Sequence, residues 1–205
     1  MFEIGEVISY LEMCSAEGVN LQRGMNYRLG NSYSVILMSV RHNAPYADQI
    51  EANGKILIYE GHDIPNLKGG PEPKTIDQPM FNPGGTLTQN GLFFEAAQRY
   101  KQGSKPESIK VYEKIRAGIW TFNGFFRLVD AWLGTSENRK VFKFRLVLLE
   151  HQSTTEVDTE IDLDHPSIIP ADVKLEVWKR DKGCCVMCGN KDNLHFDHII
   201  PYSRG

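Results

Sequence analysis

Two short groups of residues near the end of the chain have the types and spacing that metal chemistry needs. Cys185 and Cys188 form a Cys-x2-Cys pair in a tight turn closed by Gly189, which is the geometry of half a tetrahedral zinc site. Asp197 and His198 follow at the end of a short predicted strand. Hydrolysis of a phosphodiester needs an activated water and an electrophile for the developing charge, and residues of these types are suited to that chemistry.

Other interpretations of the cysteines remain open at this stage. A cysteine pair alone is compatible with a surface turn or a redox pair. A four-ligand site of Cys185, Cys188, His195 and His198 is disfavoured, because six residues separate the second cysteine from the first histidine, where a ββα zinc finger has about twelve. The remaining thiols are predicted to pack rather than to bind metal. They are Cys14 and Cys184.

The order of these pieces, Cys-x2-Cys, then a strand ending in DHIIP, then SRG, resembles the first half of the HNH (ββα-metal) nuclease family. The resemblance implies that His198 is the general base and that Asp197 is one ligand of Mg²⁺ or a similar divalent cation. It also implies that Cys185 and Cys188 bind a structural Zn²⁺. HNH domains of this type continue into a helix with a second Cys-x2-Cys pair and a further Asn or His ligand. We therefore expect the catalytic site to be incomplete in residues 1–205, and this chain to be inactive.

Hydrophobic periodicity predicts a mostly β arrangement ahead of this segment. Helices are predicted at 4–16, at 91–102 and after Pro170, the first two ending at Gly18 and Gly103. Strands are predicted at 33–40, 55–59, 108–115, 125–133 and 140–149. The Pro- and Gly-rich stretch at 65–85 is predicted to be a long functional loop.

Several stretches of the first 150 residues follow the order of landmarks in the SRA (YDG) family. They are GNSYSVILMS, ANGKILIYEGHD, KTIDQP with GGTLTQN, and FNGFFRLVDAW with VFKFRLVLLE. At the YDG tripeptide this chain has Phe122-Asn123-Gly124, which keeps an aromatic, a short polar residue and the turn glycine. The resemblance implies an α+β fold. Its first part is an SRA-like, mostly β domain with a curved sheet or partial barrel and flanking helices, and a partial ββα-metal module containing zinc follows.

SRA domains flip a C5-modified cytosine out of the duplex into a pocket, which needs flat stacking surfaces and an acceptor for the exocyclic amine. By resemblance, Tyr46 and Tyr59 stack on the base. Asp48 accepts the amine proton and repels the carbonyl of thymine, and the spacing leaves Gln49 as an alternative acceptor. Glu60 stands where many relatives have a small hydroxyl residue, so the identity of the modification stays open.

The charge distribution is compatible with DNA binding, although the chain carries a net charge of −3. The stretch from Glu150 to Asp164 holds six acids and no Lys or Arg, and the rest of the chain is at +3 without it. Between Arg99 and Arg116 six basic residues face two acids, and phosphate attraction depends on such local clustering. No apolar stretch approaches the roughly 20 residues of a membrane helix. We expect a cytoplasmic protein with no membrane partner.

These features together predict an SRA-like DNA-reading domain at 1–150, an acidic linker at 151–170 and the first part of an HNH endonuclease domain at 171–205. We expect a modification-dependent endonuclease that reads 5-methyl- or 5-hydroxymethylcytosine in double-stranded DNA. The main alternative is a non-catalytic reader of modified DNA with a structural zinc remnant, and a third is a pocket that reads unmodified DNA. The sequence leaves the flanking bases, the position of the cut and the formation of a homodimer open.

Overall fold

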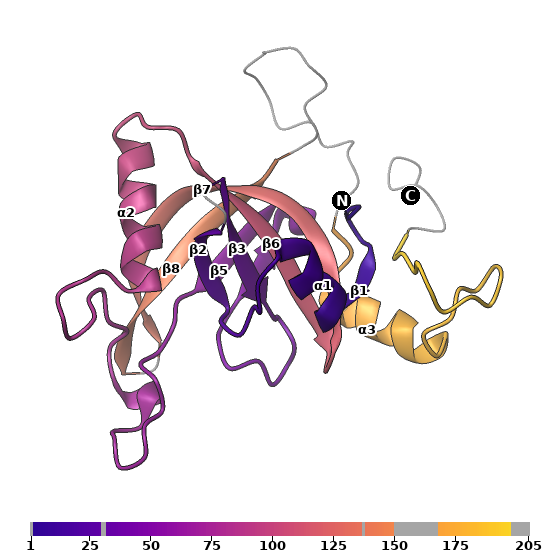
Figure 1. The fold of residues 1–205 in the computed structure, drawn as a ribbon, viewed down its shortest axis with the longest axis horizontal. Coiled ribbons are helices and arrows are strands. Elements are labelled where there is room, and N and C mark those ends of the chain that lie inside the picture. The colour runs from indigo at the N-terminus through magenta and orange to yellow at the C-terminus, as the bar shows by residue number, and fades with distance from the viewer. Residues whose placement is uncertain (1, 30–31, 137, 150–167, 198–205) are drawn as a thin grey trace.

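The computed structural model describes residues 2–29, 32–136, 138–149 and 168–197. Within them one curved sheet organises the chain, and helices lie on both sides of it (Figure 1). The strands are β1 (Val7–Ser9), β2 (Met25–Leu29), β3 (Tyr33–Met38), β4 (Gln49–Glu51), β5 (Ile56–Glu60), β6 (Glu107–Arg116), β7 (Ile119–Ser136) and β8 (Arg139–Leu148). The helices are α1 (Tyr10–Glu17), α2 (Gln89–Lys101) and α3 (Ala171–Arg180), with short 3-10 turns at Ala52–Gly54 and Pro73–Thr75.

The strand order in the described sheet is β2-β3-β6-β7-β8-β5-β4, and β1 pairs with β7. The β3–β6 pair is parallel, and the other described pairs are antiparallel. This confirms the predicted mostly β architecture with a curved sheet and flanking helices. The predicted zinc-containing ββα-metal module is not seen in residues 168–197, where α3 is followed by turns and one isolated bridge.

Alternation along β3 divides the core into two layers, because successive side chains of a strand point to opposite faces. Ile36 lies in the layer that contains Phe93 of α2. Its neighbour Val35 lies in the layer that contains Met13 of α1 and Tyr112 of β6. All of these residues are buried. Full burial of each such side chain contributes roughly 1.5–3 kcal/mol, so the sheet is held from both sides.

The first helix begins later than the predicted start at residue 4. Val7–Ser9 pairs instead with Ile119–Thr121 of β7. Ser9 then caps α1, because its side chain accepts the backbone N–H of Glu12 at 3.2 Å and its own N–H donates to the Glu12 carboxylate at 2.7 Å. Apolar residues at helical spacing ahead of Ser9 therefore belong to a strand. The predicted end at Gly18 is confirmed, with a φ of 66°.

The other predicted helices and strands are confirmed to within a few residues, apart from a longer β7. The predicted loop at 65–85 is also confirmed, with one 3-10 turn inside it. Two buried amides hold its base. Asn90 exchanges hydrogen bonds with the backbone N–H and carbonyl of His62 at 2.8 and 2.9 Å, and Gln78 donates to the carbonyl of Gly61 at 2.7 Å. The strands that went unpredicted are β1, β2 and β4.

Helix α3 is fastened to the sheet by a buried ion pair. Lys174 is 1 % exposed, and its Nζ lies 2.8 Å from Oε2 of Glu113 on β6 and 3.0 Å from the side-chain oxygen of Asn123 on β7. Desolvation lowers the pKa of Lys174, and the Glu113 carboxylate opposes that shift. Just before α3, Ile168 packs in the same core layer as Phe93. Residues 168–180 therefore contact the body of the sheet directly.

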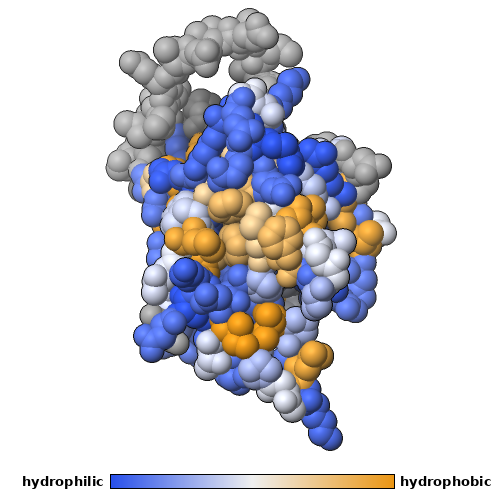
Figure 2. All heavy atoms as spheres, turned by 90° about the vertical axis from the view of Figure 1, so that its left-hand side faces the viewer, coloured by the Kyte–Doolittle hydropathy of each residue, from blue (hydrophilic) through white to orange (hydrophobic). Residues whose placement is uncertain are grey.

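The side of the molecule that carries α2 shows patches of apolar residues within a largely hydrophilic surface (Figure 2). Exposed apolar side chains include Leu67 and Phe81, which line a cavity of about 800 Å³ beside the long loop. Among the described residues, none of the helices has the length and apolar character of a membrane span.

Candidate functional site

A cavity of about 660 Å³ opens beside the segment that joins β3 to β4. Its lining includes Tyr46 and Asp48 from that segment, Tyr59 from β5 and Trp120 from β7. Pockets of roughly 300–1,000 Å³ are typical of small-molecule sites, so a single base fits the volume. The structure thus brings the two predicted stacking tyrosines and the predicted acceptor to one cavity. Gln49, the alternative acceptor, lines a different one.

Asp48 is a partly buried carboxylate held by two backbone donors. The N–H of Ser39 donates to its Oδ2 at 3.1 Å, and the N–H of Glu60 donates to its Oδ1 at 3.0 Å. Burial raises the pKa of Asp48 to about 7, although both backbone donors act in the opposite direction. Each carboxylate oxygen can accept more than one hydrogen bond. Asp48 is therefore positioned, with acceptor capacity left over, at the wall of the cavity.

The two tyrosines differ in exposure. Tyr59 is 2 % exposed, and its hydroxyl fits against Gly24, where a Cβ would lie 2.6 Å from that oxygen. Desolvation raises the pKa of Tyr59 well above its ordinary value, which keeps the hydroxyl protonated. Tyr46 is more exposed, and the Lys74 ammonium lies 4.1 Å from the centre of its ring. Tyr46 thus offers the more accessible aromatic surface, and Tyr59 borders the cavity from the core.

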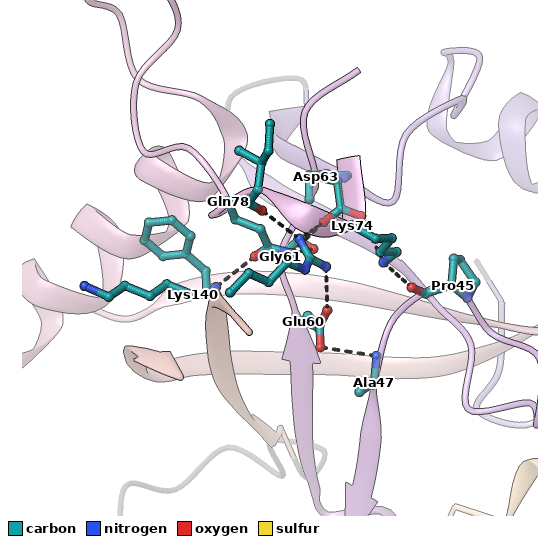
Figure 3. A network of polar contacts seen from close by, with 12 residues as sticks. Pro45, Ala47, Glu60, Gly61, Asp63, Lys74, Gln78 and Lys140 are labelled. Atoms are coloured by element: carbon teal, nitrogen blue, oxygen red, sulfur yellow. Dashed lines mark hydrogen bonds and ion pairs between the residues drawn. The ribbon is translucent and has the colours of Figure 1, made fainter. Parts of the chain in front are cut away.

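Glu60, the fourth predicted pocket residue, lies beside a neighbouring cavity of about 610 Å³ rather than the first one. It is 2 % exposed and belongs to a network of polar contacts (Figure 3). Its Oε2 accepts hydrogen bonds from Lys143 Nζ at 2.9 Å and from the N–H of Ala47 at 3.3 Å. Its Oε1 lies 3.6 Å from a guanidinium nitrogen of Arg139. Glu60 thereby ties β5 to β8 and to the β3–β4 segment.

Three cations line the first cavity without an acidic partner among the described residues. They are Arg23, Arg41 and Lys114. Lys114 belongs to the basic cluster that the sequence indicated between Arg99 and Arg116, but three other members of that cluster, Arg99, Lys101 and Lys110, are paired. Their partners are Glu95, Asp130 and Glu17, respectively. Sequence clustering could not reveal this distinction, since it depends on which side chains the fold brings into contact. Arg23 and Arg41 were missed for the same reason.

The Cys185–Cys188 turn is closed by local backbone hydrogen bonds. The N–H of Cys185 donates to the carbonyl of Asn190 at 2.7 Å, and the N–H of Gly189 donates back to the carbonyl of Cys185 at 2.8 Å. The backbone N–H groups of Cys188 and Met187 lower the pKa of the Cys185 thiol. A turn that favours the thiolate suits a zinc ligand, so this half-site fits the group that the sequence implied.

The remaining predicted metal ligands are not gathered around that turn. In the described part of the chain, no group of three or more His, Cys, Asp and Glu side chains is placed to hold a metal ion. Asp197 is exposed, and His198 lies outside the described residues. His195 pairs with Glu6 in an isolated β bridge, which attaches this segment to the N-terminal strand. The predicted Zn²⁺ and Mg²⁺ sites therefore stay predictions.

No family model matches this chain, and no curated protein does. Solved structures do match. The SRA domain of SUVH5 in complex with hemimethylated CG DNA is 20% identical, with a TM-score of 0.51 over 76% of this chain and 94% of that one. The fold is that of an SRA domain. The same domain bound to fully hydroxymethylated CG DNA matches equally well. KRYPTONITE in complex with mCHH DNA, a histone H3 peptide and SAH is 19% identical, with a TM-score of 0.51 over 78% of this chain and 34% of that one.

These matches support the SRA-like part of the sequence interpretation and not its nuclease part. None of these three structures is described as an endonuclease or as containing an HNH domain. The prediction of an HNH-type endonuclease, incomplete in this chain, therefore lacks support, and the alternative, a non-catalytic reader, is the better supported of the two.

Proposed function

We propose that this chain is a reader of double-stranded DNA that carries a C5-modified cytosine. The single observation that carries the proposal is the meeting of Tyr46, Asp48 and Tyr59 at one cavity of an SRA fold. Solved structures with this fold were obtained in complex with methylated and hydroxymethylated DNA, which supports the same class of ligand here.

The site has the groups that an extruded cytosine needs. Removing a base from the stack costs a few kcal/mol, and stacking on an aromatic ring returns roughly 1–3 kcal/mol per base. Tyr46 presents such a ring at the cavity. Asp48 has acceptor capacity for the cytosine amine, whereas thymine would present a carbonyl oxygen that its carboxylate repels. The arrangement therefore selects cytosine over thymine.

The cations around the cavity suit the phosphates on either side of an extruded nucleotide. Arg23, Arg41 and Lys114 are not engaged in ion pairs with described residues, so their charge is available to DNA. Phosphate contacts position a duplex without reading its sequence, whereas contacts to the base edge specify it. Affinity and selectivity are thus assigned to different side chains of one site.

The test is a pair of titrations with duplexes that differ only at one cytosine, methylated or not, at one fixed salt concentration. We expect Asp48→Ala and Tyr46→Ala to reduce the ratio of the two affinities. Tyr46→Phe keeps the ring and serves as the matched control. A ratio that is unchanged in both alanine variants would contradict the assignment of the pocket.

Cleavage of DNA is the second candidate activity. It is favoured by the Cys185 turn, whose geometry suits a zinc half-site, and by the Asp197-His198 pair in the sequence. In that proposal Asp197 would hold a Mg²⁺-type ion, His198 would activate water, and the reader would bring the nuclease to modified DNA.

A further inference from the structure

The N-terminal strand β1 has a different neighbour on each of its two edges. On one edge it pairs with β7. On the other edge, the N–H of Val7 donates to the carbonyl of Leu194 at 2.9 Å, and the N–H of Phe196 donates to the carbonyl of Gly5 at 3.1 Å. The C-terminal segment (residues 184–197) is thereby joined to the sheet through β1.

The inner side of β1 supports the wall of the base cavity, which is the cavity of about 660 Å³ that Asp48 lines. Trp120, the β7 partner of Ile8, is part of that wall. So is Tyr10, the first residue of α1, which follows β1 directly. The N–H of Tyr10 donates to the carbonyl of Gly118, another wall residue, at 3.1 Å. One short strand therefore lies between the proposed site for the base and the C-terminal segment.

The contact between β1 and the C-terminal segment is close-fitting but small. Phe196 is 9 % exposed. Gly5 has a φ of 93°, and a Cβ there would lie 2.9 Å from both Cε1 of His195 and the carbonyl oxygen of Phe196, so only glycine fits this approach. A ladder this short with one buried ring belongs to the less stable part of a fold, so the segment can open while the sheet stays folded.

We propose that β1 couples the base cavity to the C-terminal segment, so that DNA in the cavity and docking of the segment stabilise each other. This proposal rests on the proposed function for its ligand. Docking supports the outer edge of β1, and β1 in turn holds Trp120 and Tyr10 at the cavity wall. Release of the segment leaves β1 as an edge strand and its wall residues less ordered, so a duplex that contacts the wall binds the docked form more tightly. By linkage, the bound duplex strengthens docking by the same factor.

Amide hydrogen exchange, with and without a duplex that carries one 5-methylcytosine, tests the coupling from the side of the DNA. The N–H groups of Val7 and Phe196 report on docking, because their hydrogen bonds join β1 to the C-terminal segment. We expect a saturating duplex to slow exchange at both by roughly fivefold or more. Unchanged exchange at both with the duplex bound would overturn this inference and leave the proposed function standing. Equal affinity for methylated and unmodified duplexes would overturn the proposed function itself.

Gly5→Ala tests the coupling from the side of the segment, because its methyl group would meet His195 and Phe196 without altering a residue that lines the base cavity. We expect faster exchange at Phe196 in the free chain and an affinity for the methylated duplex that is lower by roughly fivefold or more. Gly103→Ala is the matched control. Its φ of 94° imposes the same backbone strain, nothing lies within 4 Å of its Cβ, and its turn follows α2 at the end of the molecule away from β1 (Figure 1). It should change neither quantity.

Phe196→Ala keeps the test decisive if Gly5→Ala disturbs β1 itself, because it removes the buried ring of the segment and leaves β1 and β7 unaltered. We expect the same two effects. Faster exchange at Val7 in this variant, with an affinity for the methylated duplex equal to that of wild type, would overturn the coupling. So would a slowing of exchange by DNA that is as large in Gly5→Ala as in wild type, because the duplex would then cover the segment directly.

Discussion

The tyrosine–aspartate cavity and the Cys185–Cys188 turn are built in opposite ways. The cavity takes its residues from β3, β5, β7 and the segment between β3 and β4, and buried backbone donors hold Asp48 in place. The turn is made by hydrogen bonds within residues 181–190, and Cys188 is exposed. A binding cavity of this kind exists only when the whole sheet is folded, whereas the turn forms locally and needs ligands from elsewhere to close a metal site.

Helix α3 precedes the cysteine turn in the sequence, and a buried ion pair between Lys174 and Glu113 links it to the sheet that forms the cavity. We expect Lys174→Ala to lower the free energy of unfolding by about 3–5 kcal/mol, because it leaves Glu113 buried and unpaired. Lys179→Ala, at an exposed position of the same helix, should change it by less than about 0.5 kcal/mol. Denaturant titration measures both. A small effect of Lys174→Ala would mean that α3 is not fastened to the sheet.

The Asp48 carboxylate should make the free energy of unfolding of the chain depend on pH. Its pKa is raised from 3.8 to about 7, so between those values the folded chain holds a proton that the unfolded chain has lost. The contribution of Asp48 to stability is therefore full below pH 4 and falls as pH rises to 7, by up to about 4 kcal/mol. Asp48→Asn cannot titrate. The unfolding free energy of wild type relative to this variant should therefore decrease as pH rises from 4 to 7.

Asp192→Asn, the same substitution in an exposed turn near the cysteines, is the matched control for this pH series. Binding should change in the opposite sense to stability, because the ionised form of Asp48 is the better acceptor. We expect the affinity of the wild type for the modified duplex, relative to that of Asp48→Asn, to increase from pH 6 to pH 8. A pH-independent difference between wild type and Asp48→Asn would contradict the buried position of this carboxylate.

Short local patterns explain what could be predicted from the sequence. The alternation in Phe142, Phe144 and Leu146 predicted β8, and Gly18 predicted the end of α1. Strand β4 was missed because it has only three residues, two of them polar, so its pairing depends on its neighbour in the sheet. Strand β2 is different, because Met25, Tyr27 and Leu29 alternate with Asn26 and Arg28, a short strand pattern that the sequence interpretation overlooked. The start of α1 was misplaced because Val7 and Ile8 fit either a helix face or a strand, and pairing with β7 decides between them.

The candidate site shows the same limit. Tyr46, Asp48 and Tyr59 were predicted through a family resemblance, and no pattern of local spacing would have placed Arg23 beside them. Nor could the sequence reveal that Lys101 and Lys110 are paired with acids. Such pairings join residues far apart in the chain, so only the folded sheet determines which cations face DNA.

That distinction among cations can be tested. Arg23→Ala and Lys114→Ala should each weaken modified and unmodified duplexes by similar factors and reduce the slope of log affinity against log salt by about 1. Lys101→Ala should have a smaller effect, since Asp130 already compensates its charge. Titrations at several salt concentrations decide this. An equal loss of slope in Lys101→Ala would contradict the assignment of the phosphate contacts to the cavity.

The cysteine turn should contribute no cleavage on its own. With one predicted carboxylate ligand, most of a Mg²⁺ shell is left to water, and such an ion is poorly fixed relative to a phosphate. We expect residues 1–205 to leave modified duplex DNA intact in Mg²⁺ or Mn²⁺, as followed on denaturing gels. Cleavage that is lost in His198→Ala, with DNA binding retained, would instead establish a working nuclease centre.

The most direct test of the central claim is the ratio of affinities of the wild-type chain for a duplex with one 5-methylcytosine and for the same duplex unmodified, measured at matched salt. A cavity that reads the base should give a preference of roughly 5- to 150-fold, corresponding to about 1–3 kcal/mol, and Asp48→Ala should remove most of it. Equal affinities for the two duplexes in the wild-type chain would contradict the account.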